Sequence, residues 1–217
     1  MVLIAVHGSA SRFLPAERGT ARLSLEREGD DRAAVVRDVA ALHARFAGEA
    51  EALVASGVAT RWGSRQVWVR SEPRYEGRDD QRHVVQIATA EVLARFRDFD
   101  ALSAWVLAAG AETGVTVERI EWAVTDEHRA AVERELRVLA VQDAIARAEA
   151  YASAIGGTGV TLQTLWEAGL RPSAGGGTHT FATSARLEKA DVELRPDDLE
   201  IAASVTADFA VEPGGSR

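Results

Sequence analysis

The sequence predicts an α+β fold, with mainly antiparallel sheet and three helices. Strand and helix patterns follow one another in the order ββαββαβαββ, which lacks the regular strand–helix alternation of parallel α/β proteins. Most neighbouring strand patterns are spaced closely enough for hairpins, which pair their strands antiparallel. A row of alanines at a four-residue step marks one face of a long helix, about 126–155, that we expect to pack on the sheet. The row consists of Ala140, Ala144, Ala148 and Ala152.

The first three elements are predicted by the spacing of their apolar residues. Residues 2–7 are an apolar run typical of a buried strand, and residues 20–27 alternate between apolar and polar side chains. A helix follows, with Asp30 or Asp31 as its cap and Gly57 at its end. Its apolar side chains recur at three- and four-residue steps, at Val35, Val39, Leu42, Phe46 and Leu53.

Two strands, a helix and a further strand are predicted for the middle of the chain. Residues 59–70 and 82–93 are rich in β-forming residues, and the charged connector 72–80, with its Pro and Gly, predicts a solvated hairpin loop. A second helix begins near Phe99 and ends at Gly110–Gly114. Residues 115–124 then predict a strand that carries alternating apolar residues.

The long helix is expected to begin at a cap formed by Thr125 or Asp126 and to end at Gly156–Gly157. Ion pairs one turn apart, Glu133–Arg137 and Asp143–Arg147, support it. Because its alanine row has methyl-sized side chains, the helix axis should approach the sheet more closely than a leucine-rich face would allow.

The C-terminal part predicts two more strands, 160–166 and 200–211, with a mobile loop at 171–180 between them and a disordered tail at 213–217. The last strand alternates perfectly, and Asp208 is the one charge on its polar face within 201–211. Such a strand is either central in its own sheet or at an edge, where it would pair with another chain. We expect residues 1–217 to form a single domain. A faint duplication of strand–helix–strand units makes two sub-lobes the other arrangement.

Composition excludes several classes of protein. The chain has 217 residues and a net charge of −8, with a pI near 5.2, which argues against nucleic-acid binding because that requires clustered Lys and Arg. It has no cysteine, so disulfides, thiolate nucleophiles and Cys-bound metals are absent. The N-terminal apolar run is too short for a signal peptide, and the sequence contains no apolar segment long enough to predict membrane insertion. We therefore expect a cytoplasmic protein.

Four local patterns carry a resemblance to a known family. They are Ile4-x-Val6-x-Gly8 followed by Pro15; Leu53-x3-Gly57-Val58 followed by Thr60; Gly110-Ala111 to Ile120-x-Trp122 followed by Asp126; and Ala140-Val141-x-Asp143-Ala144-x3-Ala148-Glu149-x-Tyr151-Ala152-x3-Gly156. In this order and spacing they resemble the SIMPL-domain family, bacterial proteins of unknown function. Its members include periplasmic stress-linked proteins and an immunogenic periplasmic antigen.

The resemblance covers roughly residues 2–169 and resumes in the last strand. It implies an α+β fold, self-association and a stress-related role, and it supplies no established catalytic residue. Relatives are often periplasmic or exported, which differs from the cytoplasmic location expected from the N-terminus.

Metal, phosphate and nucleophile sites are not predicted. The five histidines, His7, His43, His83, His128 and His179, are all more than four residues apart. Asp126–His128 lies in a first helical turn, where acidic residues favour the helix dipole, so capping explains it better than metal binding. Gly175–Gly177 lacks the Lys and the strand-to-helix setting of a phosphate loop. No G-x-S-x-G motif occurs. We expect no metal, no cofactor and no catalytic residue.

Tryptophans are the most informative candidates for a binding surface. Trp62 and Trp68 lie six residues apart on one predicted strand, so they should point to the same face unless Gly63 forms a bulge. Trp122 and Trp166 lie on other predicted strands. Core packing explains all four, and an exposed patch for a subunit interface or an apolar ligand is the alternative.

Three functions remain as hypotheses. The first is a non-enzymatic protein that self-associates into a homo-oligomer through sheet edges or aromatic faces. The second is a small-molecule binding module with an apolar pocket between the sheet and the long helix. The third, an enzyme, is the least favoured because no convergent polar residues are visible.

Overall fold

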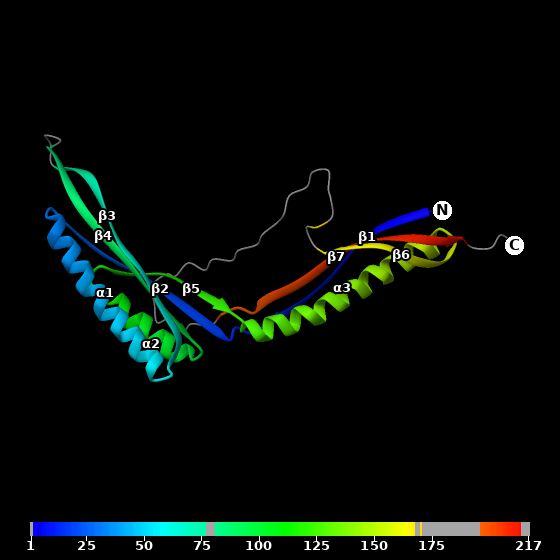
Figure 1. Cartoon of the computed structure of the whole chain (residues 1–217), viewed down its shortest axis with the longest axis horizontal. Helices are drawn as coiled ribbons and strands as arrows, with labels where there is room; N and C mark the ends of the chain where they lie inside the picture. Colours follow the sequence, from blue (N-terminus) through cyan, green and yellow to red (C-terminus); the bar gives the residue numbers. More distant parts are fainter. Residues whose placement is uncertain (1, 77–80, 168–169, 171–195, 214–217) are drawn as a thin grey trace. The chain divides into compact units, whose positions relative to one another are not determined.

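The computed structural model describes residues 2–76, 81–167, 170 and 196–213. These contain three helices and seven strands, arranged in two antiparallel sheets, which confirms the predicted α+β class (Figure 1). The order of elements is also as predicted. The elements are β1 (Val2–Leu14), β2 (Arg18–Gly29), α1 (Arg32–Ala55), β3 (Ala59–Glu76), β4 (Gln81–Phe96), α2 (Phe99–Gly110), β5 (Val115–Ala123), α3 (Asp126–Ala154), β6 (Gly157–Glu167) and β7 (Leu199–Pro213).

The chain divides into two compact units, each with its own sheet. Unit 1 consists of the described residues of 1–15, 124–182 and 197–217, and holds β1, α3, β6 and β7. Unit 2 holds the elements from β2 to β5, within residues 16–123. Each unit is described by itself below.

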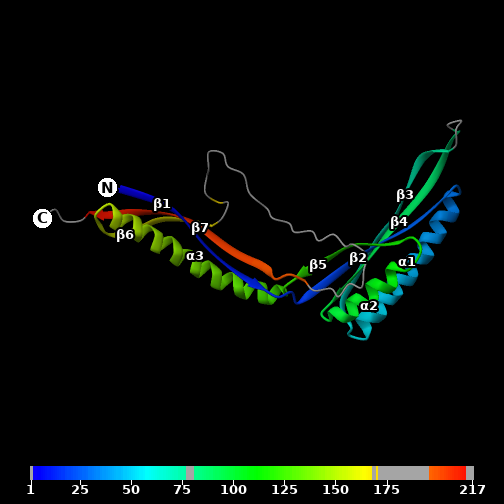
Figure 2. The same cartoon turned by 180° about the vertical axis from the view of Figure 1, so that it is seen from behind.

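Unit 2 is a four-stranded sheet in the order β3-β4-β2-β5, with α1 and α2 packed against it (Figure 2). The alternation predicted for residues 20–27 is observed, because Ala21, Leu23 and Leu25 are fully buried on the face that the helices cover. Phe96 and Leu102 are also fully buried and complete a core of large side chains.

The helix ends follow the predicted caps. The Asp31 carboxylate accepts from the Ala33 amide at the start of α1, and the Thr125 hydroxyl accepts from the His128 amide at the start of α3. The caps are therefore Asp31 and Thr125, and the alternatives Asp30 and Asp126 are not used. Gly57 and Gly156 follow α1 and α3 with φ of 76° and 80°, the left-handed conformation that glycine adopts most easily.

The prediction of a loop over the whole of 72–80 is wrong, because this segment lies largely within the hairpin of β3 and β4. The strands continue through the expected loop as far as Glu76 and resume at Gln81, and residues 77–80 lie outside the described part. Pro73 pairs with Val84 within the ladder. A proline is tolerated there because β3 is an edge strand, which needs hydrogen bonds on one side only. The predicted loop at 171–180 and all but the first residue of the predicted tail at 213–217 also lie outside the described residues.

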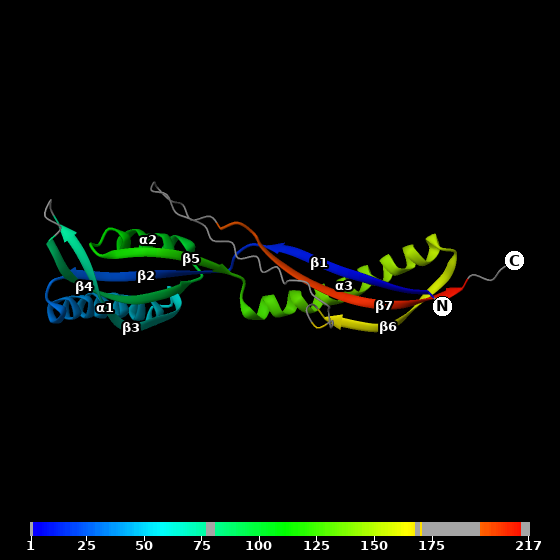
Figure 3. The same ribbon diagram turned by 90° about the horizontal axis from the view of Figure 1, so that it is seen from above.

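Unit 1 is a three-stranded sheet in the order β1-β7-β6, with α3 running along it (Figure 3). The whole alanine row of α3 is buried, as predicted. Gly8 of β1 lies directly beneath it. A Cβ atom at Gly8 would collide with the Ala140 carbonyl oxygen and would lie 2.7 Å from the Ala144 nitrogen. A strand glycine and small helix residues thus bring the two backbones together.

The last strand, β7, is central. It pairs with β1 from Leu199 to Val211 on one side and with β6 on the other. Of the two arrangements left open by its alternating pattern, the edge position is therefore wrong. The alternation instead reflects one face turned to α3, with Val205, Ala207 and Phe209 buried, and one face turned away.

Candidate interaction surface

One edge of the unit 1 sheet, at β1, is covered by α3. The Ser9 backbone amide donates to the Asp143 carboxylate at 3.0 Å, so this strand amide is already bonded to a side chain. Arg147 binds the same carboxylate at 2.9 Å, and Arg12 of β1 binds Glu135 of α3 at 2.9 Å. These contacts tie β1 to the helix and occupy part of the edge at which another strand would pair.

The Asp143 carboxyl has a pKa lowered from its ordinary value. The hydrogen bond from the Ser9 amide is the main cause, and the hydrogen bond and charge of Arg147 add to it. Partial burial acts in the opposite direction, and the nearby His7 contributes a smaller lowering. The charged Asp143 carboxylate therefore links β1 to α3, and we call its contact with the Ser9 amide the latch.

The other edge, at β6, has no comparable cover among the described residues. Residues 157–166 contain no charged side chain. Leu162 and Leu165 pair with Phe209 and Ala207, whose side chains face α3, yet each of these leucines is 46% exposed. The helix leaves them uncovered because its contacts are concentrated on β1 and β7.

The side of α3 nearest β6 carries apolar side chains as well as Arg137. Val141 lines the same cavity as Leu165, and Arg137, one turn earlier, reaches Glu167 at the end of β6. Ile145, one turn later on this row, is exposed, and so is the neighbouring Val138. We call these residues the α3/β6 strip: Val138, Val141, Ile145, Leu162 and Leu165.

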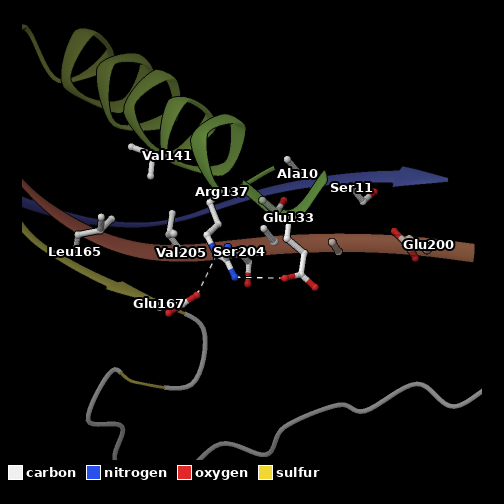
Figure 4. Close-up of a pocket in the computed structure, with 13 residues that line it drawn as sticks. Ala10, Ser11, Glu133, Arg137, Val141, Leu165, Glu167, Glu200, Ser204 and Val205 are labelled. Carbon is white, nitrogen blue, oxygen red and sulfur yellow. Dashed lines mark hydrogen bonds and ion pairs between the residues drawn. The ribbon is translucent and has the colours of Figure 1, made fainter. Parts of the chain in front are cut away.

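A cavity of about 960 Å³ lies beside the strip, between α3 and the sheet (Figure 4). Arg137 points from the helix toward β7 and binds Glu133 and Glu167, each at 3.4 Å. The first of these is the ion pair predicted from the sequence. Hydroxyl groups of Ser11 and Ser204 are also in the lining. The cavity is where the binding-module hypothesis expected one, but its lining combines apolar residues with charged ones and is not wholly apolar.

The cavity continues onto an unpaired length of β7. The ladder between β6 and β7 ends at the pair Glu167–Val205, whereas β1 pairs with β7 as far as Leu199. Within the described residues, β7 therefore has a free edge from Leu199 to Ser204. Among the described residues, this arrangement presents backbone groups of β7 at a sheet edge, where a further strand could pair.

The four predicted tryptophans are not brought into one patch. Trp62 and Trp122 are partly buried against the core of unit 2, and Trp122 packs edge-on against Phe99 at 4.9 Å between ring centroids. Trp68 is 50% exposed, with the Arg70 guanidinium 5.1 Å from its ring centroid. Trp166 belongs to unit 1, on β6, and is partly exposed.

The prediction that Trp62 and Trp68 share a face is wrong. The register between β3 and β4 shifts between Arg65 and Trp68, so one extra residue of β3 lies in that interval. A bulge of this kind turns every later side chain to the opposite face. The sequence suggests a bulge at Gly63 as the exception, and the bulge lies instead between Arg65 and Trp68.

Sequence reasoning missed the α3/β6 strip. Its residues were assigned to the correct helix and strand, but their exposure depends on where the helix lies across the sheet. The signal that could have found it was the absence of charge in residues 157–166, because edge strands usually carry protective charges. In the described part of the chain, no three potential metal ligands lie close together, and no helix is long and apolar enough to cross a membrane.

The sequence profile of the SIMPL family, described as a protein of unknown function (DUF541), matches residues 4–209. This match includes the strands and helices of both compact units. No curated protein matches the chain.

Proposed function

This chain belongs to the SIMPL family, and we propose that it acts as a non-enzymatic protein that binds further copies of itself. The α3/β6 strip is the observation that carries this proposal. Five apolar side chains of α3 and β6 are exposed or half-buried on unit 1, and residues 157–166 of β6 carry no charge. Exposed apolar side chains gathered on one helix and one strand edge are more typical of interaction sites than of catalytic ones.

The distribution of exposed apolar side chains supports the same unit. Among the described residues, most exposed large apolar side chains belong to unit 1, and unit 2 contributes Val67, Trp68, Val84 and Leu107. Self-association through unit 1 would remove this surface from water. Symmetric homo-oligomers are the commonest solution for soluble proteins.

Small-molecule binding has weaker support. The cavity has a volume typical of ligand sites, but the Arg137 side chain that crosses it is already bound to Glu133 and Glu167. A ligand would have to compete with these ion pairs or leave them in place. The cavity lining is mixed, because apolar residues such as Val141, Leu165 and Val205 lie beside charged ones.

Light scattering coupled to gel filtration tests the proposal. We expect the protein at micromolar concentration to have a mass that is a multiple of 23.2 kDa. Leu165→Lys places a charge in the centre of the α3/β6 strip and should shift the mass toward that of one chain, because the charge would lose its hydration in the contact.

Leu107→Lys is the matched control. Leu107 is 59% exposed on α2 of unit 2, so this variant makes the same chemical change on the surface of the other unit. Its mass should equal that of the wild type. A wild-type mass of 23.2 kDa at these concentrations would overturn the proposal, and so would equal effects of the two variants.

A further inference from the structure

We propose that β6 pairs antiparallel with β6 of a second copy, which joins two three-stranded sheets into one six-stranded sheet. The order across it would be β1-β7-β6-β6-β7-β1. This inference rests on the proposed self-association and names the contact that produces it. It follows from a comparison of the sheet edges in the described structure, from the symmetry of the contact and from the position of the strip.

The other described edge strands carry features that oppose pairing with another chain. In unit 2, β3 carries Arg61, Arg65, Arg70, Pro73 and Arg74, and β5 carries Glu118, Arg119 and Glu121 within nine residues. In unit 1, β1 is latched to α3 through Ser9 and Asp143. Charges, prolines and covered edges are the means by which proteins prevent strand pairing.

β6 lacks these features over ten residues. Its sequence from Gly157 to Trp166, GTGVTLQTLW, has no charge and no proline, and it is rich in Thr and Leu. Two protective features are present, register shifts against β7 between Gly157 and Gly159 and between Leu162 and Thr164, and the second leaves Gln163 as an extra residue. The strand therefore has two regular halves, Gly159–Leu162 and Thr164–Glu167.

Two copies fit together if the two-fold axis passes between Gln163 and Thr164, because side chains of the same face are then opposite one another. Antiparallel pairing in this register sets Leu162 of each copy opposite Leu165 of the other, and the irregular residues meet at the centre. Each Glu167 lies opposite the partner's Val160, and the like charges remain at opposite ends of the pair. No charge is opposed by a like charge in this register.

The same axis brings the apolar strips together. A two-fold axis perpendicular to a sheet keeps each face on its own side, so both copies of α3 would lie on one face of the joined sheet. The side of α3 that carries Val141 and Ile145 would face the partner's α3, above Leu162 and Leu165 of both copies. Strand pairing and burial of the strip are thus achieved by one contact.

The absence of cysteine from the natural sequence makes a cross-linking test possible. Single variants Thr161→Cys, Gln163→Cys and Thr164→Cys would be oxidised and examined by non-reducing electrophoresis. We expect the strongest disulfide-linked dimers with Gln163→Cys and Thr164→Cys, because both residues lie next to the axis and close to their own copies, and a weaker product with Thr161→Cys. Ser11→Cys, exposed on β1 at the opposite edge of the same sheet, is the control and should give little dimer.

A charge introduced at the edge gives an independent measurement. Thr164→Lys should weaken self-association at least about tenfold, which corresponds to about 1.4 kcal/mol. Thr116→Lys makes the same change at an exposed threonine of β5, an edge strand of unit 2, and should leave the affinity unchanged. Circular dichroism of each variant checks that it is folded.

The outcomes separate this inference from the proposed function. Cross-linking at Gln163 together with a weakened Thr164→Lys variant supports pairing through β6. An oligomer that cross-links through Ser11, or that resists Thr164→Lys, would overturn pairing through β6 while self-association stands. A wild-type protein that remains a single chain would overturn both.

Discussion

Unit 2 covers its sheet with two helices and large side chains, whereas unit 1 covers its sheet with one helix and small ones. The fully buried side chains of unit 2 include Phe96, Leu23 and Leu102. Beneath α3 the buried helix positions of unit 1 are mostly alanines. Small side chains let the helix lie close to the sheet. The contacts of α3 are concentrated on β1 and β7, so the third strand, β6, is less well covered.

The solvent-exposed surfaces of the two units also differ. In unit 2, the side chains of β2 that point away from the helices form ion pairs with β4 and, across β4, with β3. Examples are Arg22–Glu91 at 3.0 Å, Arg70–Glu26 at 3.5 Å and Arg74–Glu28 at 2.5 Å. Unit 1 instead leaves apolar side chains exposed at β6 and α3. This difference is the ground for the proposal that unit 1, and not unit 2, contacts another molecule.

The largest effect should come from the glycine under the helix of unit 1. In Gly8→Ala the new Cβ would collide with the Ala140 carbonyl and lie 2.7 Å from the Ala144 nitrogen, so backbone must move. We expect a loss of about 3 kcal/mol or more in the free energy of unfolding, at the upper end of overpacking costs. Chemical denaturation followed by circular dichroism measures it.

Unit 2 offers a matched comparison at Gly19. There a new Cβ would lie 2.6 Å from Leu102 Cδ2 and 2.6 Å from the Trp122 ring, which are the ends of side chains that can rotate away. Gly19→Ala should therefore cost less than Gly8→Ala, about 1–3 kcal/mol. Gly48→Ala, in α1 with no atom within 4 Å of the new methyl group, should stabilise the protein slightly. Equal costs at Gly8 and Gly19 would contradict the close backbone approach in unit 1.

A smaller loss is expected from the alanine row. Ala148 is fully buried, and Ala148→Leu should cost about 1–3 kcal/mol because the helix must move away from the sheet. Ala146→Leu tests an exposed alanine two residues earlier on the same helix, where leucine has no sheet to displace. Its unfolding midpoint should stay near that of the wild type. If the two variants unfold alike, the row does not set the distance between α3 and the sheet.

The order of elements could be predicted from sequence because each element carries its own periodicity. The alternation of residues 20–27 and the alanine row of α3 are local patterns, and both were confirmed. The helix caps were narrowed to two neighbours each, because a side-chain oxygen at either position can reach the first amides.

The grouping into two sheets could not be predicted in the same way. β1 pairs with β7, nearly the whole chain away, and nothing in either strand's sequence specifies the other as its partner. The turn of Trp68 to the opposite face depends on one extra residue in β3, which a periodic pattern does not reveal. The α3/β6 strip depends on how the helix lies across three strands, which is a property of the assembled unit.

The smallest effect concerns the latch at the covered edge of unit 1. The Ser9 amide and Arg147 hold the pKa of Asp143 below its ordinary value, so the folded state binds this proton more weakly than the unfolded state. The stabilisation is therefore complete above the ordinary pKa, near 4, and is lost as the pH falls through the lower pKa of the folded protein. Asp143→Asn should lower the free energy of unfolding modestly at pH 7, and the difference from the wild type should shrink at pH 3. Denaturation of both proteins at the two pH values measures this, and a difference that is the same at both would show that the carboxylate charge does not stabilise the contact between β1 and α3.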